Sequence, residues 1–188
     1  MSAAEISIRP ARLDDTPALE SLIVESVMIL QADHYTLEQR EGALGTVFGV
    51  DTQLIRDGTY LVAEAGELIV GCGGWSKRKT LFGSDHVPQK DDAWLDPRFD
   101  AARIRAFFIR PGWARRGIGS RILEACESAA IAQGFTRFEL VATLPGVPMY
   151  RARGFQAAEK FDVPLPNGAK LPVVRMRKAG ATRLGALS

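Results

Sequence analysis

Hydrophobic residues alternate with polar ones in some segments of the chain and recur at helical spacing in others, and this pattern predicts the order of the elements. Ile6 and Ile8 alternate with polar residues, so residues 5–11 are expected to form a short strand. The residue types of Asp14-Asp15-Thr16-Pro17 are typical of a helix start, and apolar positions over residues 19–30 then follow helical spacing. Thr36-Leu37-Glu38-Gln39 has the form of a capping box, which predicts a second helix.

The middle of the chain is dominated by strand patterns. Two apolar runs, residues 59–65 and 67–75, meet at Gly66, and their arrangement predicts a hairpin. The glycines at positions 71, 73 and 74 indicate a bulge or a close backbone approach in the second of these strands. Residues 76–100 follow no regular pattern, as is typical of a binding loop or a mobile segment.

The second half of the chain alternates between strands and helices. Strands are expected over residues 102–109, 137–141, 155–163 and 171–177, and helices over residues 119–133 and 148–153. This order predicts an α/β (α+β) fold: a single mixed, mostly antiparallel twisted sheet of about seven strands flanked by about four helices. We expect one domain over residues 1–188, with a core of about residues 5–178 and a C-terminal tail, residues 179–188, that frays.

Composition and charge narrow the class of protein. The 188 residues are 46% hydrophobic and 24% charged, which is enough apolar material for a folded core. The formal net charge of +2 gives little support to nucleic acid or an anionic membrane as a partner. No apolar run reaches the length of a membrane span and the N-terminus does not resemble a signal peptide, so a cytoplasmic protein is expected. Two cysteines and two histidines are too few for a disulfide framework or a metal site, so no metal is expected.

The segment with the clearest chemistry is a basic, glycine-containing turn between a strand and a long helix. It reads Ile109-Arg110-Pro111-Gly112-Trp113-Ala114-Arg115-Arg116-Gly117-Ile118-Gly119-Ser120. The first amides of a helix have no intrahelical acceptors and attract anions, and glycines let a ligand come close to them. The pattern favours a diphosphate-binding turn. A plain strand–helix connection with an arginine pair in solvent explains the local sequence equally well.

Two motifs in the same order and spacing give the chain a resemblance to the GNAT superfamily of N-acetyltransferases. Residues 102–130 are similar to its acyl-CoA-binding motif, and Met149-Tyr150-Arg151-Ala152-Arg153-Gly154-Phe155 is similar to its Tyr-x-x-x-Gly-Phe motif. The sequence departs from the family pattern at Ala114, where the family often has Gln or Arg. The resemblance implies an enzyme that moves an acetyl or other short acyl group from acyl-CoA to a primary amine, by direct attack through a tetrahedral intermediate.

The resemblance also implies which residues bind acetyl-CoA. The turn and the first helical residues are expected to bind the diphosphate, and the backbone of the preceding strand the pantetheine arm. The expected cofactor-binding residues are Phe107, Ile109, Arg115, Arg116, Gly117, Ile118, Gly119 and Ser120. A backbone amide near residues 108–109 is expected to stabilise negative charge on the acetyl oxygen.

Tyr150 matches the general acid of the family, which protonates the departing thiolate. An aromatic side chain that only packs the short helix against the sheet is the alternative. The general base is not identified, because residues 102–109 contain no carboxylate. Glu64 and Glu139 on neighbouring strands are candidates, although each is more typical of a solvated strand position.

The acceptor is open at this stage. His34, Tyr35 and residues 76–100 are candidates to shape its site, and either a small molecule or a peptide amine fits the family. The alternative to an enzyme is a non-catalytic acyl-CoA sensor or interaction module on the same fold. A homodimer is compatible with the strand edge that residues 155–163 and 171–177 leave.

Overall fold

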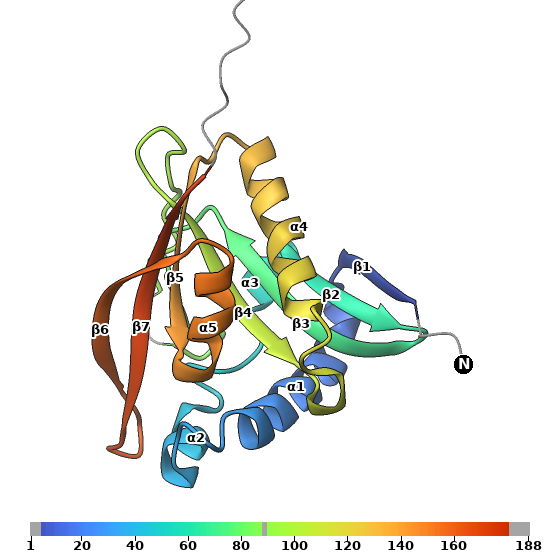
Figure 1. The fold of residues 1–188 in the computed structure, drawn as a ribbon, viewed down its shortest axis with the longest axis vertical. Helices are drawn as coiled ribbons and strands as arrows, with labels where there is room; N and C mark the ends of the chain where they lie inside the picture. Colours follow the sequence, from blue (N-terminus) through green and yellow to red (C-terminus); the bar gives the residue numbers. More distant parts are fainter. Residues whose placement is uncertain (1–4, 88–89, 181–188) are drawn as a thin grey trace, which may run out of the picture.

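The structure is a computed structural model that describes residues 5–87 and 90–180, and a seven-stranded sheet forms its centre (Figure 1). The strand order is β1-β2-β3-β4-β5-β7-β6. The strands are β1 (Ile6–Pro10), β2 (Tyr60–Ala65), β3 (Leu68–Ser76), β4 (Ala102–Ile109), β5 (Arg137–Thr143), β6 (Gln156–Pro164) and β7 (Lys170–Ala179). Every neighbouring pair is antiparallel except β4 and β5, which are parallel. The predicted mixed, mostly antiparallel sheet is confirmed.

Helices cover both faces of the sheet. The five α-helices of the described residues are α1 (Thr16–Glu25), α2 (Leu37–Ala43), α3 (Thr52–Arg56), α4 (Ile118–Ala132) and α5 (Val147–Ala152). Buried residues of α1, α2 and α3 belong to one core cluster, and those of α4 and α5 to the other. Figure 1 shows α4 and α5 in front of the sheet and α3 behind it. The sequence analysis predicts about four helices and does not include the five-residue α3, which is too short to show helical periodicity.

Local sequence signals account for most element boundaries. The predicted capping box is present at α2: Thr36 Oγ1 accepts from the Gln39 amide and Gln39 Oε1 accepts from the Thr36 amide, at 3.2 and 2.9 Å. Gly66 and Gly134 have φ of +62° and +93° and provide the hairpin turn and the end of α4. The helix after Thr16 does not continue regularly to residue 30, because Ser26–Leu30 form a π-helical turn.

The sheet opens between β4 and β5. Their register pairs only Ala102 with Phe138 and Arg103 with Glu139, and Figure 1 shows the two strands spreading apart beyond that end. On its other side β4 pairs with β3, with a register shift opposite Gly73 and a backbone φ of +57° at Ala106. The irregularity expected at the glycines of β3 is here a β-bulge whose extra residue lies in β4, because Ala106 and Phe107 lie opposite Gly73 alone. Beyond Arg103 the β4 backbone has no strand partner among the described residues on the β5 side.

The structure bears on the predicted C-terminal tail and on the edges of the sheet. Residues 181–188 of the predicted frayed tail lie outside them, and β7 runs to Ala179. No helix in the described ranges is both long and apolar enough to cross a membrane. At the two edges of the sheet lie β1 and β6, and the homodimer stays a prediction.

Candidate functional site

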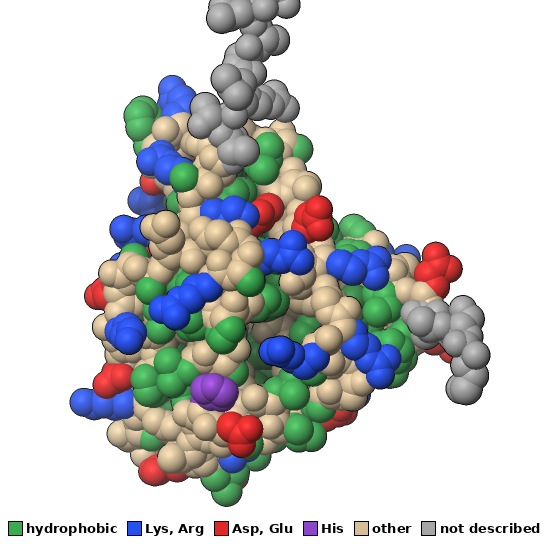
Figure 2. Space-filling model, in the orientation of Figure 1, with side chains coloured by type: hydrophobic (Ala, Val, Ile, Leu, Met, Phe, Trp, Pro, Cys, Tyr) green, Lys and Arg blue, Asp and Glu red, His purple; other side chains and the backbone are tan. Residues whose placement is uncertain are grey.

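A cavity of about 870 Å³ occupies the opening between β4 and β5. Figure 2 shows it as a hollow on the face that carries α4 and α5, with Lys and Arg side chains gathered around the rim. Its lining draws on both core clusters, with Ile118 and Tyr150 from one and Phe48 and Phe108 from the other. The cavity therefore passes through the sheet and joins its two faces.

At one end the cavity meets the basic turn that precedes α4. Arg115 and Gly117 both have a left-handed backbone, with φ of +63° and +76°, and Gly117 is the residue that caps α4. The first amides of this 15-residue helix have no intrahelical acceptors, and the positive end of its dipole faces the same way. A Cβ at position 119 would lie 2.9 Å from Met149 Sδ, so a larger residue there would require the Met149 side chain to move. The arrangement can bind a phosphate or diphosphate.

Most of the predicted cofactor-binding residues line this one cavity. Those that line it are Phe107, Ile109, Arg115, Gly117, Ile118, Gly119 and Ser120. Arg116 is the exception: its guanidinium stacks on the Trp113 ring, 4.7 Å from the ring centroid, and it is not a lining residue. Its predicted contact with the diphosphate stays a prediction.

Buried side chains of β2 and β3 contact the backbone of the β4 bulge. The Tyr60 hydroxyl lies 3.2 Å from both Cys72 Sγ and the Ala106 carbonyl oxygen, so its single proton serves one of them. Burial raises the pKa of the Cys72 thiol to about 12, which keeps it protonated and unreactive. Cys72 is a free cysteine and is fully buried next to the bulge.

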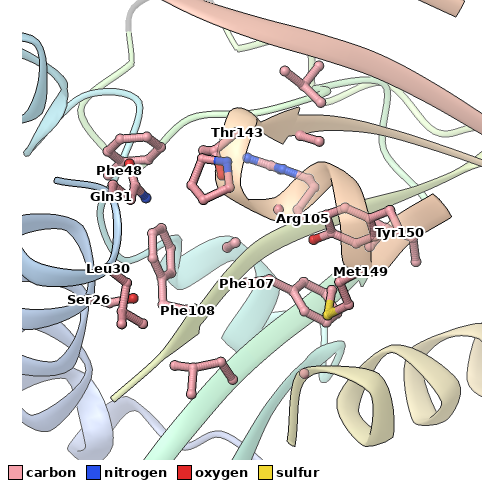
Figure 3. Close-up of a pocket in the computed structure, with 18 of the residues that line it drawn as sticks. Ser26, Leu30, Gln31, Phe48, Arg105, Phe107, Phe108, Thr143, Met149 and Tyr150 are labelled. Carbon is pink, nitrogen blue, oxygen red and sulfur yellow. The ribbon is translucent and has the colours of Figure 1, made fainter. Parts of the chain in front are cut away.

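Tyr150 lies on α5 at the wall of the cavity and is 8% exposed. Its ring meets those of Phe107 and Phe155 edge-on, with centroids 6.2 and 5.8 Å away. No hydrogen bond joins its hydroxyl to another side chain of the described residues, and burial raises the pKa of the phenol above its ordinary value. Figure 3 shows the Tyr150 hydroxyl end directed toward the interior of the pocket, on the same side as Met149. The phenol therefore holds its proton at neutral pH next to open space.

Neither carboxylate considered as a base lines the cavity. Glu64 pairs with Arg9, and Glu139 pairs with Arg103 at 2.7 Å. The titratable residues that do line it are Asp33, His34, Arg105, Arg115 and Tyr150. Of these side chains, the Asp33 carboxylate and the His34 imidazole are of the types that act as general bases.

The α1–α2 connection closes one side of the cavity. Tyr35 fastens this connection across the opening, because its hydroxyl donates to the Pro172 carbonyl at 2.7 Å and accepts from the Leu144 amide at 2.9 Å. Figure 3 shows Gln31 of this connection, with Phe48 beside it, across the pocket from Tyr150. His34 and Tyr35, which the sequence singled out, belong to this segment.

Of the described part of the long loop after β3, Leu81, Phe82 and Gly83 line the cavity, as expected for residues 76–100, but its charged start does not. The Arg78 guanidinium bonds Asp57 at 2.7 Å and stacks 4.1 Å from the Trp94 ring centroid, and Lys77 lies over the same ring. Residues 77–79 do not line the cavity. His86 is likewise absent from its lining.

Sequence reasoning missed a group of buried charges at the cavity. Arg105 on β4, Asp51 before α3 and Lys90 in the long loop come together from positions that share no motif. Only the N-cap position of Asp51 has a local signal, and that signal concerns a helix start.

Comparison with known proteins connects this site to a family. The model of the acetyltransferase (GNAT) family matches residues 25–155, which include β2–β5, α4 and α5. This range covers both motifs around the cavity. A search of curated proteins found no significant match.

Solved structures share the fold across nearly the whole chain. A GCN5-related N-acetyltransferase from Rhodopseudomonas palustris has a TM-score of 0.69 at 21% identity, covering 95% of this chain and 98% of that one. The PaiA N-acetyltransferase from Thermoplasma acidophilum, solved with coenzyme A, has a TM-score of 0.63 at 16% identity, covering 93% and 99%. The ribosomal-protein-S18-alanine N-acetyltransferase from Escherichia coli has a TM-score of 0.59 at 13% identity, covering 98% and 99%.

Proposed function

Because the chain belongs to the acetyltransferase (GNAT) family, we propose that it moves an acetyl or other short acyl group from acyl-CoA to the primary amine of a small molecule. The observation that carries this proposal is the cavity between β4 and β5, in which the turn before α4 and the Tyr150 phenol face one space. The α1–α2 connection, which Tyr35 fastens over one side of the cavity, favours a small acceptor over a folded protein surface.

The residues at the cavity fit coenzyme A. Gly117 has no atom within 4 Å of the position where a Cβ would lie, so its backbone is accessible to a phosphate, and Arg115 adds a full positive charge. The open side of β4 beyond Arg103 has amides and carbonyls for the amide-containing arm. When bound, acyl-CoA supplies an activated acyl group as a thioester.

The chain's own groups account for the charge that the reaction creates. Attack by the amine nitrogen forms a C–N bond and places negative charge on the carbonyl oxygen, which a backbone amide next to the β4 bulge would stabilise. Cleavage of the C–S bond then releases a thiolate. Tyr150 donates its proton to that sulfur, and its raised pKa keeps it protonated until the charge develops.

Proton removal from the amine falls to the α1–α2 connection. An alkylamine with a pKa near 10.4 is neutral in only about one molecule in a few thousand at pH 7. Asp33 and His34 are the lining groups that can take this proton, directly or through water. Separate variants, Asp33→Asn and His34→Gln, assign the role: at saturating acceptor and one fixed pH, the variant that lacks the base should lose far more kcat than the other, while both still bind coenzyme A.

Two neighbouring arginines allow a matched test of the diphosphate site. Arg115→Ala should weaken coenzyme A binding, measured by calorimetry, by about tenfold or more, because a charged hydrogen bond is lost. Arg116→Ala should weaken it less, since this side chain stacks on Trp113. Turnover of acetyl-pantetheine, which has no diphosphate, should not respond to Arg115→Ala.

The reaction itself is tested by following thiol release from acetyl-CoA with a panel of amines, and by mass spectrometry of the acylated product. Amine-dependent thiol release with product formation supports the transferase. Tight coenzyme A binding without release for any amine would instead support the non-catalytic sensor. A protein that does not bind coenzyme A would overturn both.

A further inference from the structure

A cluster of three buried charges lies at the cavity where β4, the start of α3 and the long loop after β3 meet. Asp51 Oδ2 is 2.7 Å from Arg105 Nη2 and 3.1 Å from Lys90 Nζ. The three side chains are 1%, 4% and 14% exposed, respectively. Arg105 is a lining residue of the cavity, so this cluster is in contact with the proposed acceptor space.

One carboxylate in this cluster faces two cations. The second oxygen of Asp51 is already used, because Oδ1 accepts from the Gln53 amide at 3.1 Å. Burial lowers the pKa of the Arg105 guanidinium in spite of the neighbouring carboxylate. Asp92 is a further carboxylate near enough to act on the charge of Arg105, so the charges around the guanidinium are close to balanced.

The Arg105 guanidinium also has a free donor. Nη2 donates to the Gly83 carbonyl at 2.8 Å, but the buried Nε has no hydrogen-bond partner among the described residues. A buried N–H without an acceptor destabilises a protein by roughly 1–3 kcal/mol. A ligand carboxylate would supply the acceptor that Nε lacks.

A second unpaired polar group lies on the opposite wall. Gln31 is 6% exposed and lines the cavity, and its buried Oε1 has no partner within residues 5–87 and 90–180. It directly follows the π-helical turn Ser26–Leu30, and such turns are frequent at functional sites. Its carboxamide can hydrogen-bond a polar group of a bound acceptor.

The wall between these polar groups is apolar. Phe48 and Phe108 meet edge-on with ring centroids 5.9 Å apart, and Leu30, Phe82 and Val173 also line the cavity. Figure 3 shows Leu30, Phe48 and Phe108 on the same side of the pocket. An apolar body of amino-acid side-chain size fits this surface.

From this combination we propose that the acceptor is a hydrophobic free amino acid, whose carboxylate pairs with Arg105 while its apolar side chain packs on Phe48 and Phe108. This inference rests on the proposed acyl transfer. The α-amine attacks the thioester, so that an N–C bond forms, the C–S bond breaks, and the products are an N-acyl amino acid and the coenzyme A thiol. The amine proton leaves to the base, and Tyr150 protonates the sulfur.

Matched acceptors test the carboxylate. Leucine is compared with isoamylamine and leucinamide, and phenylalanine with phenethylamine, all with acetyl-CoA as donor. The free acids should have a kcat/KM about 10- to 100-fold higher, as expected for one charged hydrogen bond. Glutamate should be a poor acceptor because its side chain is charged, and the tripeptide Leu-Gly-Gly should be poor because its first carboxyl is an amide.

A double variant tests the role of Arg105, and a single variant tests that of Gln31. In the double variant Arg105→Gln, Asp51→Asn, both charges are replaced together, so no buried charge of the pair is left without its counterpart. The ratio of leucine to isoamylamine kcat/KM should fall to about one. Gln31→Leu should lower kcat/KM for both acceptors. Thermal stabilisation of the protein–coenzyme A complex by 3-phenylpropionate, a carboxylate without an amine, should be seen in the parent protein and absent in the double variant.

The outcomes separate this inference from the proposed function. Equal or faster acylation of the decarboxylated amines or of Leu-Gly-Gly would overturn the amino-acid acceptor and leave the transferase intact, with Arg105–Asp51 as a structural ion pair. Failure of every amine to release thiol would overturn both. A selectivity for free acids that survives in the double variant would overturn the assignment to Arg105.

Discussion

Replacement of Tyr150 by phenylalanine removes one oxygen from the wall of the cavity and little else. The ring keeps its edge contacts with Phe107 and Phe155. Its hydroxyl has no hydrogen bond to a side chain of the described residues, so no partner is left unpaired. The free energy of unfolding should therefore change by less than about 1 kcal/mol.

The effect on turnover should be far larger. A positioned general acid typically contributes about 10²- to 10⁴-fold, which is about 3–5 kcal/mol of barrier. Because Tyr150 is proposed to act on the departing sulfur, kcat should fall by this factor while the affinity for coenzyme A changes less than about threefold. With an acetyl thioester of a more acidic thiol, the difference in kcat between the variant and the parent should be smaller, because that thiolate leaves without needing a proton.

Initial rates, calorimetry and thermal melting measure the three quantities separately. Tyr35→Phe is the matched control, because it also removes a buried tyrosine hydroxyl, but one with two hydrogen bonds that fasten the α1–α2 connection. It should lower stability by roughly 1–3 kcal/mol and lower kcat much less than Tyr150→Phe does. If Tyr150→Phe keeps full turnover, or loses stability and activity together, the acid role is wrong.

Three further predictions test the residues that shape the backbone around the cavity. In Gly73→Ala, the new Cβ would lie 2.7 Å from the Phe107 ring, so kcat/KM should fall, whereas Gly112→Ala meets open space and should be neutral in the same assay. Gly117→Ala meets no atom but has a φ of +76°, so it should lower stability by about 1–2 kcal/mol and weaken coenzyme A binding, and an unchanged melting temperature would contradict this. Burial raises the pKa of the Tyr35 phenol to about 12, from an unfolded value near 10. Its contribution to the free energy of unfolding is therefore complete below pH 10 and is lost as the pH rises toward 12. Denaturant titrations should show that Tyr35→Phe loses less stability than the parent protein over this pH range.

The parts of this molecule that sequence reasoning predicts are those whose causes are local. The capping box at Thr36 and the turn from Pro111 to Ser120 depend on residues within a few positions of one another. The strand at residues 102–109 and the helix that follows the turn were expected within one residue of their observed bounds. The residues proposed to bind the diphosphate meet at one cavity for the same reason, since almost all of them lie in one continuous segment.

The acceptor side resists prediction because it is assembled from distant segments. Arg105, Asp51 and Lys90 meet only after β4, the start of α3 and the long loop have packed together. The same assembly removes Glu64 and Glu139 from consideration, because arginines on neighbouring strands already pair with them. An acidic residue on a strand next to the site has the same local sequence whether it faces the cavity or an arginine.

The bulge in β4 depends both on local sequence and on contacts between distant segments. Residues 102–109 have an ordinary strand pattern, yet Ala106 adopts a φ of +57°, which is unfavourable by roughly 1–2 kcal/mol for a residue with a Cβ. The glycine at 73 leaves room for the Phe107 ring, and the Tyr60 hydroxyl lies at the Ala106 carbonyl, 46 positions away. A proton donated to that carbonyl polarises the peptide group that ends in the Phe107 amide. The buried tyrosine thus supports the backbone conformation at the point where β4 leaves β5 and where the proposed acyl group is bound.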